Sequence, residues 1–227
     1  MNEITHHIQK NILKYLTTAK SARYSEMRPH KVDSNLYAYH LKKLVALGFI
    51  IQEGRKYTLS PAGINYVEAV SLDKFNIRSQ PKITTRILLK NHKNQYLLTK
   101  RVKQPMIEMW GFPSGKIHNL DNRIIDSARR ELREKTGVEL RTLNHVGDYY
   151  ARIVAKNEVI SNTFSHVFIS RVSVHEYEAI SATKNENLQW CSPEEIPNFN
   201  IIPDTIDLIY LSSQADGRFF AELEYEI

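Results

Sequence analysis

The sequence has one cysteine, few glycines and prolines, and no long hydrophobic run. Cys191 is the single cysteine among 227 residues, which excludes an intrachain disulfide and a zinc cluster built from several cysteines. Eight glycines and eight prolines exclude a collagen-like or low-complexity chain. No apolar run approaches the roughly 18 residues that a membrane-spanning helix needs. The first residues, MNEITHHIQK, lack the basic-then-apolar order of a signal peptide, so we expect a cytoplasmic protein.

The composition is typical of a globular chain that is long enough for two domains, each with its own core. Hydrophobic residues make up 42% and charged residues 25%, which excludes a disordered chain. The positive charge is uneven, because residues 1–80 hold 12 Lys+Arg and 6 Asp+Glu, a net of +6 that equals the net charge of the whole chain. The excess in the first third indicates an anionic partner such as nucleic acid, with a solvated basic surface as the alternative.

Residues 4–70 show the pattern of several helices with a hairpin before the last one. Apolar residues at helical spacing predict a helix over 4–19, and a short helix around 24–27 is closed by Pro29. A third helix begins at Asp33 or Ser34 and stops at Gly48. Residues 49–60 are typical of two short strands around a turn, and Pro61 then starts another helix. The apolar side of the third helix is expected to hold Leu36, Tyr37, His40, Leu41, Leu44 and Leu47.

This order of elements is that of a winged helix, and the stretch NLYAYHLKKLVALGFIIQEGRKYTLSPAG resembles the recognition helix and wing of MarR/ArsR-like regulators. The resemblance implies a DNA-binding domain over residues 1–70, followed by a linker over 71–82, with the third helix in the major groove. A module for protein interaction or dimerisation is the alternative. Phosphate contacts are expected from Lys42, Lys43, Arg55 and Lys56, and contacts to base edges from Ser34, Asn35 and Tyr39.

The remaining residues alternate strands and helices as an α/β sandwich does. Strands are expected over 83–90, 95–101, 143–154, 159–174 and 186–193, and helices over 124–137 and 203–215. His145 and His166 have no second histidine at ligand spacing, so metal binding by either is not expected.

The stretches WGFPSGKI and ARRELREKTGV closely resemble the Nudix family. Its signature is Gly, five residues, Glu, seven residues, then Arg-Glu-aliphatic-x-Glu-Glu-x-Gly-aliphatic. The resemblance implies a two-domain α+β chain, in which a winged helix-turn-helix precedes a Nudix α/β/α sandwich with a mixed sheet over residues 83–227. It also implies nucleoside diphosphate chemistry with Mg²⁺ or Mn²⁺. The matching residues are Gly115, Arg130, Glu131, Leu132, Glu134, Gly137 and Val138.

Carboxylates three and four positions apart on a helix lie on one side and can converge on one cation. The candidate catalytic residues are Glu131 and Glu134, which the resemblance also makes metal ligands together with the Gly115 carbonyl. Arg130, Lys116 and Lys135 are the candidates for substrate binding, and Arg130 would also hold the loop and the glutamates in place.

The signature is damaged at two positions. Asn122 falls where the first glutamate is expected, with Asp121 beside it and one extra residue in the gap after Gly115. Lys135 replaces the second residue of the Glu-Glu pair and changes the local charge by two units. One pair of unit charges at 4 Å is worth about 4 kcal/mol at an effective dielectric of about 20, so metal binding is expected to be weak or absent.

Two arrangements of Lys135 remain open. Its side chain points to water while Glu131, Glu134 and a later carboxylate, such as Glu186 or Glu158, hold one metal. Alternatively its ammonium takes the position of the metal and contacts the diphosphate directly.

Two functions follow from these features. The first is a transcription regulator, working as a homodimer, that binds duplex DNA and senses a nucleoside-diphosphate-linked small molecule with weak or no hydrolysis. The second is an active Mg²⁺-dependent Nudix pyrophosphohydrolase with an accessory winged-helix module. The basic first third and Lys135 favour the regulator.

Overall fold

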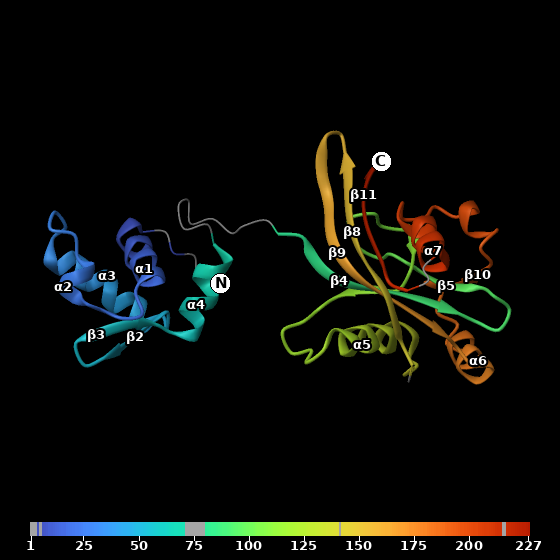
Figure 1. The fold of residues 1–227 in the computed structure, drawn as a ribbon, viewed down its shortest axis with the longest axis horizontal. Coiled ribbons are helices and arrows are strands. Elements are labelled where there is room, and N and C mark those ends of the chain that lie inside the picture. Colours follow the sequence, from blue (N-terminus) through green and yellow to red (C-terminus); the bar gives the residue numbers. More distant parts are fainter. Residues whose placement is uncertain (1–3, 5, 71–79, 141, 215–216) are drawn as a thin grey trace. The chain divides into compact units, whose positions relative to one another are not determined.

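The computed structural model describes residues 4, 6–70, 80–140, 142–214 and 217–227. The chain divides into two compact units, residues 1–79 and 80–227, which we describe one at a time (Figure 1). Most of the predicted linker, residues 71–79, lies outside the described residues. In the part of the chain that the structure describes, no helix has both the length and the apolar character needed to cross a bilayer.

The first unit has the predicted winged-helix order. Its strands pair in the order β1-β3-β2, and both pairs are antiparallel. The hairpin of β2 and β3 follows the third helix, as the sequence predicts, while the short strand β1 was not expected. The elements are α1 (His7–Thr18), β1 (Ala22–Arg23), α2 (Tyr24–Met27), α3 (Ser34–Ala46), β2 (Ile50–Glu53), β3 (Lys56–Leu59) and α4 (Pro61–Ala69).

Helix α3 packs against α1 through one side only. The Asp33 side chain caps it by accepting a hydrogen bond from the Leu36 amide at 2.8 Å, which decides between the two predicted caps. His40 is buried and stacks on His6. Leu36 and Leu47 were expected in the core but are exposed. With 3.6 residues per turn they share a different side of the helix from the buried Tyr37, Leu41 and Leu44.

The second unit is an α/β/α sandwich with a mixed sheet, as predicted. Its described residues form an eight-stranded sheet in the order β10-β5-β4-β9-β8-β11, with β6 beside β5 and β7 beside β4. The pairs β4–β9 and β8–β11 are parallel and the others antiparallel. The strands are β4 (Lys82–Lys90), β5 (Tyr96–Lys100), β6 (Trp110–Gly111), β7 (Ser114–Lys116), β8 (Asn144–Ala155), β9 (Glu158–Arg171), β10 (Leu188–Cys191) and β11 (Phe219–Glu226).

Helices cover both faces of this sheet (Figure 1). The bounds are α5 (Ile124–Thr136), α6 (Val174–Ala182), a 3₁₀ turn over Ile196–Asn198 and α7 (Thr205–Gln214). Strand β4 alternates between the two cores, because Ile87 and Leu89 pack with α5 and α6 whereas Leu88 packs with α7. Helix α6 and strand β11 were not predicted from the sequence.

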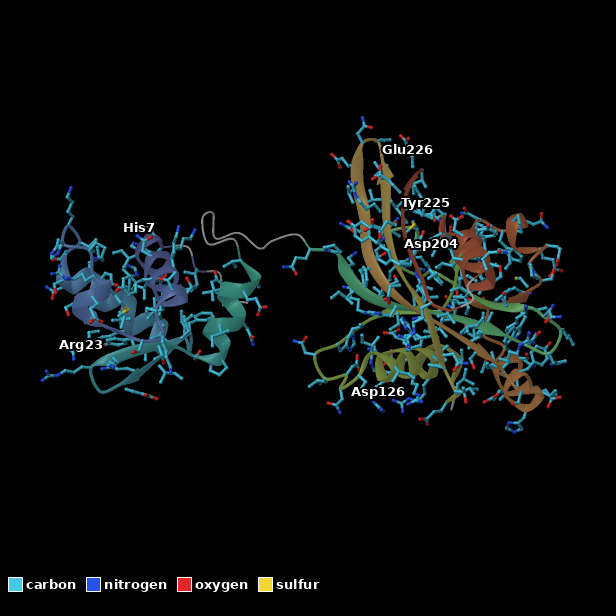
Figure 2. All side chains as sticks on the ribbon, in the orientation of Figure 1. His7, Arg23, Asp126, Asp204, Tyr225 and Glu226 are labelled. Atoms are coloured by element: carbon cyan, nitrogen blue, oxygen red, sulfur yellow. The ribbon has the colours of Figure 1, made fainter. Side chains whose placement is uncertain are left out.

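A buried ion pair joins β4 to the start of α7. Arg86 Nη2 lies 2.6 Å from Asp204 Oδ2, and both side chains are almost fully buried. Asp204 immediately precedes α7 and is labelled near this helix in Figure 2.

Candidate functional site

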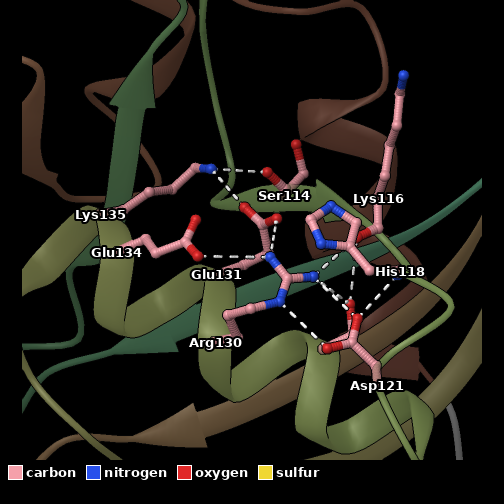
Figure 3. Close-up of polar contacts among 9 residues, drawn as sticks. Ser114, Lys116, His118, Asp121, Arg130, Glu131, Glu134 and Lys135 are labelled. Atoms are coloured by element: carbon pink, nitrogen blue, oxygen red, sulfur yellow. Dashed lines mark hydrogen bonds and ion pairs between the residues drawn. The ribbon is translucent and has the colours of Figure 1, made fainter.

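Helix α5 carries the signature residues and is fixed by its apolar side. Ala128 and Leu132 are fully buried against the sheet, and the helix ends at Gly137, whose left-handed backbone (φ 74°) donates a hydrogen bond back to the Arg133 carbonyl. Arg130, Glu131 and Lys135 of this helix face the segment that contains Gly115 (Figure 3).

Gly115 leaves the space that the Glu131 carboxylate fills. A Cβ atom at position 115 would overlap both oxygens of that carboxylate. Gly115 also lies in the short strand β7, opposite Thr85 of the central strand β4. The glycine is therefore required by the close approach of a side chain that starts sixteen positions later.

Both oxygens of Glu131 are already bound by cations from the same helix. Arg130 Nη1 donates to Oε1 at 2.8 Å, and Lys135 Nζ donates to Oε2 at 3.0 Å. The Lys135 ammonium also donates to the Ser114 carbonyl oxygen at 2.8 Å, so it joins the helix to the loop (Figure 3). Of the two predicted arrangements, the structure has the one in which Lys135 turns inward.

Arg130 pairs with Asp121 rather than with a residue at position 122. Its Nε and Nη2 donate to the two Asp121 oxygens at 3.1 and 2.9 Å, and Nη2 also donates to the Lys116 carbonyl at 3.0 Å. These bonds hold the pKa of the Asp121 carboxyl well below its usual range. Asn122 is exposed.

The alignment of the signature with the sequence is therefore corrected. Asp121 follows Gly115 after five residues, as the first glutamate of the signature does, and the extra residue lies between Asp121 and Arg130. The spacing from Gly115 already pointed to Asp121. Counting back from Arg130 instead led to Asn122, because the extra residue lies within that interval. Only Lys135 remains as a loss of a signature carboxylate.

Glu134 and Lys116 lie apart from the Glu131 carboxylate. The Glu134 side chain is 58% exposed, and its nearest cation is Arg130 at 3.6 Å. The Lys116 side chain is exposed and extends away from Glu131, while its carbonyl serves as an acceptor for Arg130 (Figure 3). The predicted site residues thus divide into an inner group around Glu131 and two side chains outside it.

A cavity of about 360 Å³ opens beside Lys135, within the size range of small-molecule sites. Lys100, Arg101 and Lys103 line it together with Lys135, and Glu134 is the one acidic residue among its described lining residues. The other lining residues are polar or apolar without charge, namely Thr99, Ser114, Asn185, Asn187, Val102, Phe112, Leu188 and Ile202.

The positive charge of this cavity is only partly neutralised. Burial lowers the pKa of Arg101, and the Arg86 guanidinium lowers it further, yet an arginine stays charged at neutral pH. The sequence analysis missed Lys100, Arg101 and Lys103, because they lie at the end of a strand or just after it and match no motif. The cavity suits an anion that carries an apolar or aromatic group.

The arrangement around Glu131 does not fit a divalent cation. A Mg²⁺ or Mn²⁺ ion needs several free oxygen ligands, but the two Glu131 oxygens are engaged by Arg130 and Lys135. The Lys135 ammonium lies between a carboxylate and a backbone carbonyl, two of the ligand types that such a metal would use. The residues present thus hold a fixed positive charge at this point.

The predicted DNA-contacting residues are all exposed in the first unit. Asn35, Tyr39 and Lys42 follow one another at i, i+4 and i+7 along α3, so they share one side of the helix. Lys43 is exposed beside them, and Ser34 begins the helix. The residues Arg55 and Lys56 lie at the turn between β2 and β3, also exposed.

The comparison with protein-family models agrees with the fold of the second unit. The family model of the NUDIX domain matches residues 80–210. None of the curated proteins matches the sequence. Among solved structures, NrtR of Shewanella oneidensis is similar at 19% identity with a TM-score of 0.48, over 57% of this chain and 60% of that one.

Two further structures are similar to the chain at low identity. The NUDIX domain of Shewanella oneidensis NrtR, in complex with ADP ribose, matches at 15% identity and TM-score 0.49, over 69% of this chain and 98% of that chain. A MutT protein of Bacillus halodurans matches at 18% identity and TM-score 0.46, over 64% and 90% of the two chains. Because the family model covers more than half of the sequence, the chain belongs to the Nudix family.

Proposed function

We propose that the chain is a DNA-binding transcription regulator whose Nudix domain senses a nucleoside-diphosphate-type ligand without metal-dependent turnover. One observation carries this proposal: the Lys135 ammonium bridges Glu131 and Ser114 at the wall of a cation-lined cavity. A Nudix domain that held a metal there would need this point free. The domain instead supplies its own positive charge.

The ligand class follows from the residues that line the cavity. A diphosphate carries clustered negative oxygens, and Lys100, Lys103 and Lys135 offer ammonium groups while Arg101 offers a guanidinium. The asparagines provide donors and acceptors for a sugar or base, and Phe112 provides an aromatic surface. Lys135 binds the phosphates as a point charge in this proposal, and Glu131 and Arg130 hold it in place.

Binding by the parent chain and by Lys135→Gln tests the ligand proposal. Charge-assisted hydrogen bonds contribute about 1.5–3 kcal/mol, so we expect the affinity for ADP and for inorganic pyrophosphate to fall at least about tenfold. Isothermal titration without divalent metal, in chelator, measures the change. Lys156→Gln, at an exposed position in the turn after β8, is the matched control and should bind as the parent does. Equal affinities of the parent and Lys135→Gln would contradict the proposal.

A turnover assay, read together with the binding measurements, separates the regulator from the enzyme. Turnover of nucleoside diphosphate compounds above about 1 s⁻¹ with Mg²⁺ or Mn²⁺, lost in Glu131→Gln, would favour the pyrophosphohydrolase. Turnover that is absent, together with tight binding in chelator, would favour the sensor.

DNA binding is tested in the first unit. We expect the full chain to bind duplex DNA with an affinity that falls as salt rises, and the quadruple change of Lys42, Lys43, Arg55 and Lys56 to glutamine to flatten this dependence. Each phosphate contact adds about 0.9 to the slope of log affinity against log salt, so the loss is up to about 3.6. Fluorescence anisotropy with a random-sequence duplex measures it.

The control is a second quadruple variant, which removes the same number of positive charges from the second unit. Arg171, Lys156, Lys184 and Arg218 are exposed there, and their change to glutamine should leave the slope unchanged. Salt-insensitive binding of the parent, or equal slopes for the two quadruple variants, would contradict DNA binding by α3 and the β2–β3 hairpin. Light scattering on the same samples tests the proposed homodimer.

A further inference from the structure

Two histidines and an aspartate meet on strands β8 and β9, away from the signature segment. His145 Nε2 lies 3.0 Å and His166 Nδ1 lies 2.7 Å from the same Asp148 oxygen, Oδ1. The three ligand atoms all lie within 4.8 Å of one another, and each residue is partly buried. Sequence spacing gave no hint of this cluster, because the two histidines are 21 positions apart.

A β-bulge builds the cluster. On a regular strand, residues three positions apart point to opposite faces, so His145 and Asp148 would be separated by the sheet. The pairing of β8 with β9 shifts between His145 and Gly147, which adds one residue to β8 and turns both side chains to the same face. Asp148 is directly opposite His166 in the register. Such bulges often re-aim side chains at functional sites.

We propose that His145, Asp148 and His166 form a site for a divalent transition metal, with Zn²⁺ as the best-fitting ion. Zinc is held by imidazole nitrogens and carboxylate oxygens at about 2.0–2.2 Å in a tetrahedral arrangement. At those bond lengths the ligand atoms are about 3.4 Å apart, so small side-chain shifts from the present 2.7 and 3.0 Å admit the ion. Two imidazoles select such a metal over Mg²⁺ or Ca²⁺, which prefer all-oxygen sites.

The surroundings of the cluster favour a site with oriented imidazoles and one coordination position open to solvent. The rings of Phe164 and His166 pack edge-on, with their centroids 5.6 Å apart. The centroids of the Phe168 and His145 rings are 5.4 Å apart. These aromatic rings restrict the orientation of both imidazoles. The side chains remain 17–34% exposed, so solvent can reach the site and supply the fourth ligand. The site would fasten β8 to β9 at the bulge.

Metal titration of the chelator-treated full chain tests this site. We expect one Zn²⁺ to bind, and Co²⁺ to give the intense visible absorption of a tetrahedral complex. Removing one ligand should weaken Zn²⁺ binding by more than the roughly 10- to 100-fold that is usual for outer-shell partners. The two variants are His166→Gln and Asp148→Asn. The second replaces the carboxylate by an amide of nearly the same shape. Zn²⁺ should raise the melting temperature of the parent chain and of neither variant.

Three controls separate this site from other metal-binding groups. Glu131→Gln removes the signature carboxylate, and His175→Gln removes an exposed histidine of α6, and both should bind Zn²⁺ as the parent does. His7→Gln removes an exposed histidine of the first unit and should also bind Zn²⁺ as the parent does. If Asp148 only accepts two hydrogen bonds, Zn²⁺ will bind Asp148→Asn and the parent equally, and the proposal is overturned. Circular dichroism establishes that each variant is folded, and His145→Gln replaces any that is not.

Discussion

Lys135→Glu is expected to create divalent metal binding beside Glu131, a position at which the parent chain has little or none. The change removes an ammonium that donates to Glu131 and Ser114 and places a third carboxylate beside Glu131 and Glu134. One unit pair at 4 Å is worth about 4 kcal/mol at an effective dielectric of about 20. The Lys135 side chain is 31% exposed, so solvent screens much of this. We therefore expect Mn²⁺ affinity, followed by electron paramagnetic resonance, to rise about 10- to 100-fold.

The same variant should be less stable than the parent when no metal is present. Glu131 and Lys135 form a favourable i, i+4 ion pair, and the substitution replaces it with two like charges at the same spacing. Added Mn²⁺ should raise the melting temperature again, by an amount that grows with the logarithm of its concentration above the dissociation constant. Lys135→Gln separates the loss of the positive charge from the gain of a negative one. If the parent already binds Mn²⁺ as tightly as Lys135→Glu, the ammonium does not stand in for a metal.

Asp204→Asn is expected to lower the free energy of unfolding of the second unit by about 3–5 kcal/mol. Arg86 is buried on the central strand β4, and Asp204 Oδ2 lies 2.6 Å from its guanidinium. Removing the carboxylate leaves a buried positive charge without its counter-ion, which is far more costly than the pair itself is stabilising. Asp204 also precedes α7, where a negative charge is favourable.

Urea unfolding followed by tryptophan fluorescence measures this effect in the second unit alone, because both tryptophans, Trp110 and Trp190, belong to it. The paired change of Arg86→Met with Asp204→Leu is the matched control, since apolar replacement of a whole buried pair is often neutral or stabilising. A loss of unfolding free energy below about 1 kcal/mol in Asp204→Asn is the size usual for exposed ion pairs. It would show that Asp204 does not neutralise a buried charge on Arg86.

The sequence by itself determined the order of the helices and the hairpin in the first unit and the position of the signature helix. Both are local properties: the apolar residues of α1 recur at helical spacing, and the residues from Arg130 to Val138 lie on one helix or at its end. Caps and stops such as Asp33, Pro61 and Gly137 act on their immediate neighbours, so they are readable from the chain.

Only the tertiary structure decided which polar groups meet. The direction of Lys135 depends on the Ser114 carbonyl, 21 positions earlier, and a residue type alone leaves both arrangements open. Asp121 pairs with Arg130 because the loop closes onto the helix. Counting the spacing back from Arg130 placed the partner one residue too late, at Asn122.

The same reason applies to His145 and His166. Strand pairing and a bulge bring them together, and register is set by the packing of the whole sheet rather than by either strand. The sequence therefore predicted the elements and the family signature, whereas the identity of the cation beside Glu131 and the histidine cluster arise from contacts between residues that are distant along the chain.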